Sequence, residues 1–87
     1  MEFPELITLL NSKGILNKDV NCKANLNKND RDFYEFYAYN RPYSVTIRFI
    51  GDEKEVTFVQ IDNDITGETF EITGNVYCND FEQFNRG

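Results

Sequence analysis

The side chains that could do chemistry in this chain are carboxylates, tyrosines and two cysteines. The sequence contains no histidine. Without His there is no Ser–His or Cys–His pair, and acid–base catalysis near neutral pH would need a carboxylate or a lysine whose pKa is shifted by burial. We therefore expect a protein that is not an enzyme, with no catalytic residues and no cofactor.

The two cysteines, Cys22 and Cys78, are separated by 55 residues and belong to no CxxC pair. A zinc site would need more thiolate or imidazole ligands than this chain offers. We expect two buried free thiols in a reducing cytoplasm. The alternative is a single disulfide between them, which would stabilise the fold by about 4 kcal/mol in the chain-entropy account.

An apolar run from Val56 to Ile61 is followed by the segment 62–66, which reads DNDIT. The segment resembles the DxDxT motif of haloacid-dehalogenase-type phosphatases, a resemblance that implies a nucleophilic Asp62 and an acid/base Asp64. That family also needs a later lysine and further carboxylates on a doubly wound sheet. Only 21 residues follow Thr66, and none of them is Lys, so we reject a phosphatase.

The same segment is similar to the first half of an EF-hand calcium loop. Asp62, Asp64 and Thr66 carry oxygen atoms at positions 1, 3 and 5, and Gly67 stands at position 6. Position 12 falls on Thr73 instead of the bidentate Glu of that loop. We expect a solvated hairpin loop and no metal site. Weak Ca²⁺ or Mg²⁺ binding by Asp62, Asp64 and Glu68 is the alternative.

The net charge of −6 is concentrated in the second half of the chain. Residues 1–44 carry six acids and six bases, whereas residues 51–85 carry nine acids against Lys54 alone. A domain with a pI near 4.5 lacks the clustered cations that displace counterions from phosphates, so we expect no direct binding to nucleic acid. The acids favour either a basic protein partner or simple solubility.

We expect a small acidic interaction protein, an inhibitor or nucleic-acid mimic of the kind that viruses and mobile elements use as host-defence antagonists. It would occlude a basic surface on another protein, for example a host nuclease, a defence complex or another nucleic-acid-binding enzyme. A structural or assembly subunit and a weak divalent-metal-binding module are the alternatives. The residues expected to bind the partner are Asp52, Glu53, Glu55, Asp62, Asp64, Glu68, Glu71, Tyr37 and Tyr39.

Hydrophobic periodicity predicts the elements that would position these side chains. Residues 3–14 have an early proline, an acid in the first turn and a final glycine, which predicts a helix with a leucine stripe at 6, 9 and 10. Alternation with a period of two predicts strands at 20–27, 32–40, 43–49, 55–61 and 68–73. No apolar run is long enough to span a membrane, so we expect no membrane partner.

The whole chain, 1–87, is expected to be a single compact α+β domain. An N-terminal helix would pack on a 4–5-stranded antiparallel meander sheet, with a short C-terminal helix or cover segment. The strand at 32–40 carries aromatic residues on both faces. One face would lie against the leucine stripe. We expect Phe81 and Phe84 to fold back over the second face, leaving Tyr37 or Tyr39 partly accessible.

Overall fold

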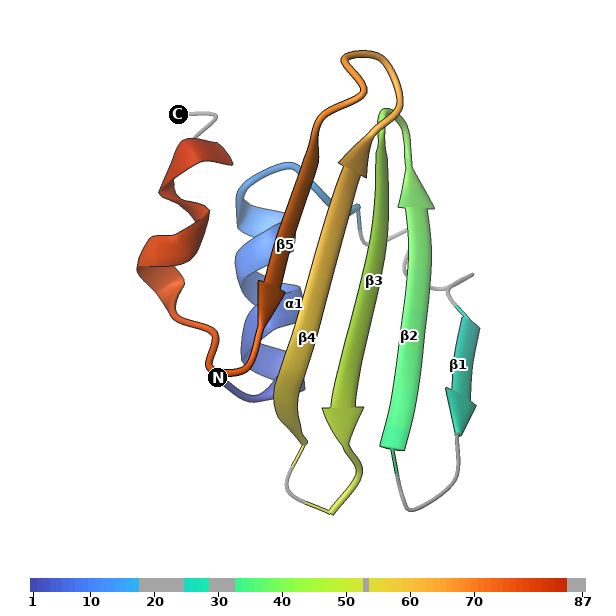
Figure 1. Ribbon diagram of the computed structural model, residues 1–87, viewed down its shortest axis with the longest axis vertical. Helices are drawn as coiled ribbons and strands as arrows, with labels where there is room; N and C mark the ends of the chain where they lie inside the picture. Colours follow the sequence, from blue (N-terminus) through green and yellow to red (C-terminus); the bar gives the residue numbers. More distant parts are fainter. Residues whose placement is uncertain (18–24, 29–32, 53, 85–87) are drawn as a thin grey trace.

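The computed structural model describes residues 1–17, 25–28, 33–52 and 54–84. Its five strands form one antiparallel sheet in the order β1-β2-β3-β4-β5, so each strand pairs with its neighbour in sequence (Figure 1). The elements are α1 (Phe3–Ser12), β1 (Asn25–Lys28), β2 (Phe33–Asn40), β3 (Tyr43–Ile50), β4 (Glu55–Asn63), β5 (Thr69–Thr73) and the 3-10 helix η2 (Cys78–Phe84). The predicted α+β class and meander are confirmed.

Helix α1 begins and ends where its sequence predicts. A capping box links Glu2 and Glu5, the Glu2 N–H donating to the Glu5 carboxylate at 3.5 Å. The Lys13 N–H donates to the Leu9 carbonyl at 3.0 Å, and Gly14 then turns the chain with a φ of 77°. Leu6 and Leu10 are fully buried, as is Ile15 after the glycine. Helix α1 is therefore anchored to the sheet by its leucine stripe.

Side chains along the strands alternate between a buried face and a face that no helix of the described residues covers. On β3, Tyr43, Val45, Ile47 and Phe49 are buried, and the residues between them are half-buried or exposed. Strand β4 extends two residues further than predicted, because Asp62 pairs with Ser44 and Asn63 with Tyr43. The predicted loop at 62–67 is therefore shortened. Its first two residues belong to the sheet, and their side chains point to opposite faces.

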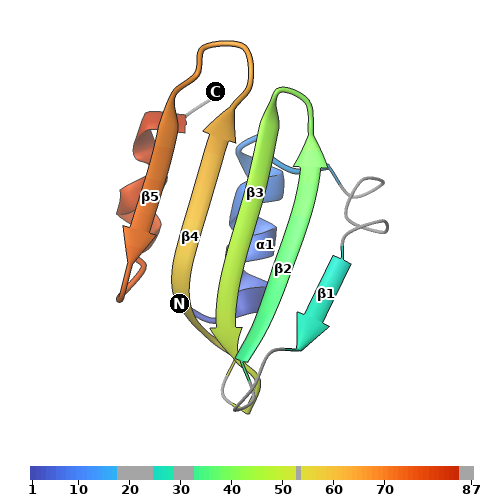
Figure 2. The same cartoon turned by 45° about the vertical axis from the view of Figure 1, so that its right-hand side comes forward.

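The C-terminal segment folds back, but over the face that α1 already covers. Phe81 is fully buried in the same core as Leu6 and Leu10, and its ring lies 5.4 Å from that of Phe70 on β5. Figure 2 shows α1 and η2 on one side of the sheet, and no other helix or strand of the described residues covers the opposite side. The prediction that Phe81 and Phe84 cover the second face of β2 is wrong.

The physical reason lies in the strand order. Helix η2 follows β5, and β3 and β4 separate that edge strand from β2. The side chains of Phe70 and Ile72 pack against the core from β5. A short connection from β5 brings Phe81 to this apolar surface, whereas the outer face of β2 lies two strands further away.

Neither α1 nor η2, the helices of the described residues, is long and apolar enough to cross a membrane.

The cysteine expectation is corrected at one of its two positions. Cys78 is a free, exposed thiol at the start of η2, not a buried one. Cys78 lines a shallow hollow at the surface together with Leu9 and Ser12 of α1. Cys22 and most of the strand predicted at 20–27 lie outside the described residues. The part that is described, β1, continues to Lys28.

Candidate functional site

The open face of the sheet carries three large aromatic side chains in contact with solvent. Phe33, Tyr37 and Tyr39 on β2 are 39%, 42% and 45% exposed. Alternation places them opposite the buried Phe36 and Ala38 of the same strand. Large apolar groups are usually exposed singly, so three on one strand are notable. We define the open face as the side of the sheet away from α1 and η2.

The middle of the open face is occupied by an arginine with two neighbours. The Arg48 Nε donates to Glu35 Oε2 at 2.9 Å, and its guanidinium carbon lies 4.7 Å from the centre of the Phe58 ring. Glu35 and Phe58 are the direct cross-strand partners of Arg48 on β2 and β4. Arg48 and Glu35 therefore neutralise each other at the centre of the face.

The end of the face near the β4–β5 turn is acidic. Asp62 accepts hydrogen bonds from Gln60 Nε2 at 3.1 Å and from Thr69 Oγ1 at 2.9 Å. Neither donor carries a charge, so the negative charge of Asp62 is not balanced by them. Glu71 lies opposite Gln60 in the sheet and is exposed.

Tyr39 belongs to this acidic end. Partial burial of its ring, a hydrogen bond from its hydroxyl to the Asp64 carboxylate and the negative charge of Asp64 raise the pKa of Tyr39 above its ordinary value. The Asp64 N–H donates to the Pro42 carbonyl at 2.8 Å, which ties the β4–β5 turn to the β2–β3 turn. The backbone thus holds Asp64 beside Tyr39.

The structure brings together five of the nine residues expected to bind a partner. Tyr37 and Tyr39 share the open face with three acids, Asp62, Asp64 and Glu71. The other four residues are placed elsewhere. Asp52 lies in the β3–β4 turn, at the end of β4 opposite to Asp62. The 9 residues of β4 span roughly 26 Å at about 3.3 Å per residue. Glu53 lies outside the described residues.

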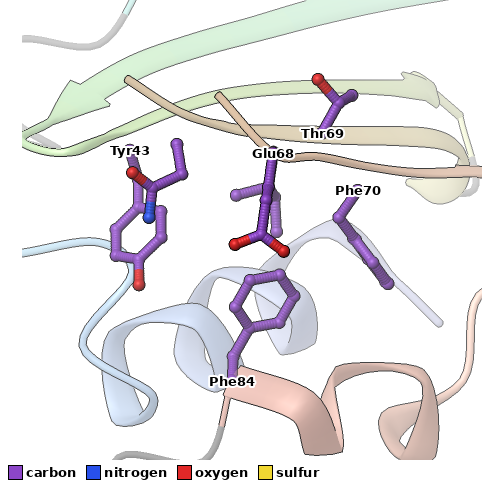
Figure 3. Close-up of a pocket in the computed structure, with 7 residues that line it drawn as sticks. Tyr43, Glu68, Thr69, Phe70 and Phe84 are labelled. Carbon is purple, nitrogen blue, oxygen red and sulfur yellow. The ribbon is translucent and has the colours of Figure 1, made fainter. Parts of the chain in front are cut away.

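Two further expected acids are directed away from the acidic end of the open face. Glu55 accepts from the N-terminal ammonium group of Met1 at 3.3 Å, at the other end of β4. Glu68 lines a cleft on the helix side of the sheet (Figure 3). The acids predicted as one surface are therefore divided between two ends and two faces of the sheet.

This division also separates the carboxylates of the alternative metal site. Asp62 and Glu68 lie on opposite faces, and the Asn63 side chain between them accepts from the N–H groups of Ile65 and Thr66 at 2.9 and 3.1 Å. Within the described part of the chain, no group of three His, Cys, Asp or Glu side chains is placed to hold a metal ion. The loop is a closed hairpin turn with its own hydrogen bonds.

Sequence reasoning missed Arg48 and Phe58 as members of the open face. Cross-strand register was the missing signal, because it aligns Arg48 with Glu35 and Phe58 only once both hairpins are paired.

Comparison with protein-family models, with curated proteins and with solved structures finds no match to this chain.

Proposed function

We propose that this chain is a small, non-enzymatic interaction protein that occludes a basic surface of a partner protein with the open face of its sheet. The observation that carries the proposal is the juxtaposition of exposed Tyr37 and Tyr39 with the carboxylates of Asp62, Asp64 and Glu71. Tyrosine supplies a large contact area at little conformational cost, and it is enriched among the residues that dominate binding energy.

Charge favours a basic partner. Arg48 is already paired with Glu35, and the hydrogen-bond donors to Asp62 are an amide and a hydroxyl. A lysine or arginine on a partner would supply the charge that balances Asp62, Asp64 and Glu71. Such complementarity speeds association and selects the partner more than it adds affinity.

The same charges disfavour direct binding of nucleic acid. Exposed tyrosines on a sheet face can stack on bases. Stacking proteins also need a positive groove that follows the phosphates, whereas Asp62, Asp64 and Glu71 would repel them. Carboxylates on a rigid sheet instead stand in for phosphates. The class of partner that this suits best is an enzyme or defence complex whose own nucleic-acid site is basic, in the cytoplasm of a host cell.

The experiment compares capture by three forms of the protein from extracts of the cells in which it acts. These forms are the wild type, the open-face variant Tyr37→Ser/Tyr39→Ser/Asp62→Asn, and the control Asp52→Asn/Glu82→Gln. The control removes two exposed acids that lie away from the open face. We expect the wild type and the control to retain the same basic protein, and the open-face variant to lose it by at least about tenfold.

The captured partner is then purified, and its association rate is measured between about 0.1 and 1 M salt, where the Debye length falls from about 10 to 3 Å. We expect a steep decrease for the wild type and a shallower one for Asp62→Asn/Glu71→Gln. A salt-independent rate, or retention of the partner by the open-face variant, would contradict the proposal and favour a structural subunit. Binding to a single-stranded oligonucleotide that the open-face variant lacks would assign the tyrosines to base stacking instead.

A further inference from the structure

A cleft of about 350 Å³ lies on the helix side of the sheet, between the β4–β5 hairpin and the end of η2 (Figure 3). It is separate from the open face, because the sheet stands between them. Its walls are the rings of Tyr43, Phe70 and Phe84, with Ile61 and Asn63 between them. This volume is at the lower limit of ligand sites in proteins, so the cleft suits one side chain or a small molecule.

The aromatic walls hold one another in position. The Phe84 ring makes T-shaped contacts with Phe70, at 5.1 Å and 89°, and with Tyr43, at 6.3 Å and 82°. Phe70 also contacts the fully buried Phe81. Aromatic rings in such pairs gain energy beyond their buried area. The cleft is therefore formed before any ligand arrives.

A single carboxylate completes the cleft. The Glu68 side chain points from the β4–β5 hairpin toward the Phe84 ring in Figure 3. Its backbone is fixed on both sides, since the Glu68 N–H donates to Thr66 Oγ1 at 3.2 Å and its carbonyl accepts from the Asn63 N–H at 2.9 Å. The described residues offer this carboxylate no ion pair, and none of those that line the cleft is basic.

From these features we infer that the cleft binds one organic cation, a guanidinium or alkylammonium group, between Glu68 and the aromatic walls. A carboxylate and the faces of aromatic rings attract the same kind of ligand, because both present negative potential to a cation. An anion would be repelled by Glu68, and a purely apolar ligand would desolvate that carboxylate without pairing it. The inference stands independently of the function proposed for the open face.

The test is a titration of ¹⁵N-labelled protein with Nα-acetyl-arginine amide, called arginine amide below, followed by amide chemical shifts. The matched neutral ligand is Nα-acetyl-citrulline amide, called citrulline amide below, in which a urea group replaces the guanidinium and no charge remains. We expect arginine amide to shift the amides of Glu68, Phe70 and Phe84 in a saturable way, and citrulline amide to bind at least about fivefold more weakly. Tetramethylammonium is expected to shift the same amides through the aromatic walls.

Glu68→Gln keeps the shape of the side chain and removes its charge. We expect it to weaken binding of arginine amide by about fivefold, while Glu82→Gln, an exposed acid on η2, leaves binding unchanged. Thermal melts of both variants verify that the fold is intact. Equal binding of arginine and citrulline amides, an unchanged affinity in Glu68→Gln, or shifts confined to Asp62 and Asp64 would each overturn the inference.

A capped Gly-Arg-Gly peptide identifies where the cation comes from. If the peptide shifts the cleft amides at least as strongly as arginine amide, the cleft receives a side chain of a partner protein. If the free cations bind and the peptide does not, the site is one for a small amine or guanidine. Both results support the recognition of an organic cation.

Discussion

The two faces of strand β2 both carry aromatic residues, yet only one of them is buried. On β2, the buried Phe36 and Ala38 alternate with the exposed Tyr37 and Tyr39. One face is covered twice, by the leucine stripe of α1 and by the phenylalanines of η2, and no described helix covers the other. The aromatic content of β2 therefore does not decide which of its faces is buried. Its pairing with β3 does, because Phe36 and Ala38 lie beside buried apolar residues of β3, whereas Tyr37 and Tyr39 lie beside Thr46 and Ser44.

The two faces of the sheet also differ in the charged side chains that they carry. The side chains buried on the helix side are all apolar or aromatic, and the described residues include no buried charged group. The open face pairs its aromatic residues with Glu35, Arg48, Asp62 and Glu71. A surface that keeps its charges hydrated while exposing tyrosine rings is suited to reversible contact with another protein, because its free form is not strongly destabilised.

The largest expected effect is on the covered face. Phe81→Ala removes a fully buried ring and should lower the free energy of unfolding by about 3–5 kcal/mol. Phe33→Ala, the same change on the open face, should cost no more than about 1.5 kcal/mol, because that ring is 39% exposed already. Urea denaturation measures both. If Phe81→Ala fails to fold, Phe81→Leu, which keeps most of the volume, should fold and cost about 1–2 kcal/mol.

Equal costs for the two phenylalanines would break the comparison between the faces. They would mean that Phe33 is also covered in solution, for example by a second copy of the chain. Sedimentation of the wild type and Phe33→Ala over a range of concentrations separates this outcome from a simple error in the expected energies. We expect Phe33→Ala to leave the sedimentation coefficient unchanged.

A smaller effect is expected from the ion pair at the centre of the open face. Glu35 and Arg48 are 2.9 Å apart, but half of the Arg48 side chain is exposed, at 51%. A double-mutant cycle with Glu35→Gln and Arg48→Gln should give a coupling energy of about 0.5 kcal/mol that decreases with salt. A coupling above about 2 kcal/mol would show that this part of the face is shielded from water, contrary to an open surface.

The smallest expected effect is the titration of Tyr39. Because the pKa of Tyr39 is raised in the folded protein, the unfolded chain loses this proton first as the pH increases. The resulting stabilisation is complete below about pH 10, the ordinary tyrosine pKa, and is lost as the pH rises through the higher folded value. ¹³C-tyrosine NMR should show Tyr39 titrating late, and Asp64→Asn should shift its pKa downward. If Asp64→Asn leaves the Tyr39 titration unchanged, Asp64 does not interact with Tyr39 and is not part of the acidic end of the open face.

Local residue patterns were sufficient to predict most of the fold. Pro4, Glu5 and Gly14 act within a few residues of the helix ends, so the sequence alone indicates α1. Alternation in Tyr43–Ile50 and Glu55–Asn63 similarly indicates β3 and β4. These signals are local, and tertiary packing agrees with them.

The candidate site depended on the tertiary structure. Charge counting grouped Asp52, Glu55, Asp62 and Glu68 as one acidic surface, because a count of charges along the chain does not show on which face or at which end of the sheet each side chain lies. Pairing of β4 with β3 and β5 then placed Asp52 and Asp62 at opposite ends of the sheet and Glu68 on the opposite face. A shift by one residue along a strand exchanges its two faces, so register decided this separation.

By itself, the sequence determined one helix, a meander of antiparallel strands and an excess of negative charge in the second half. Only the tertiary structure decided that Phe81 joins Leu6 and Leu10 in a single core and leaves Tyr37 and Tyr39 uncovered. The reason is that both faces of β2 are apolar enough to be buried. Which of them is covered depends on the register with β3, which places Phe36 and Ala38 beside the buried Ile47 and Val45.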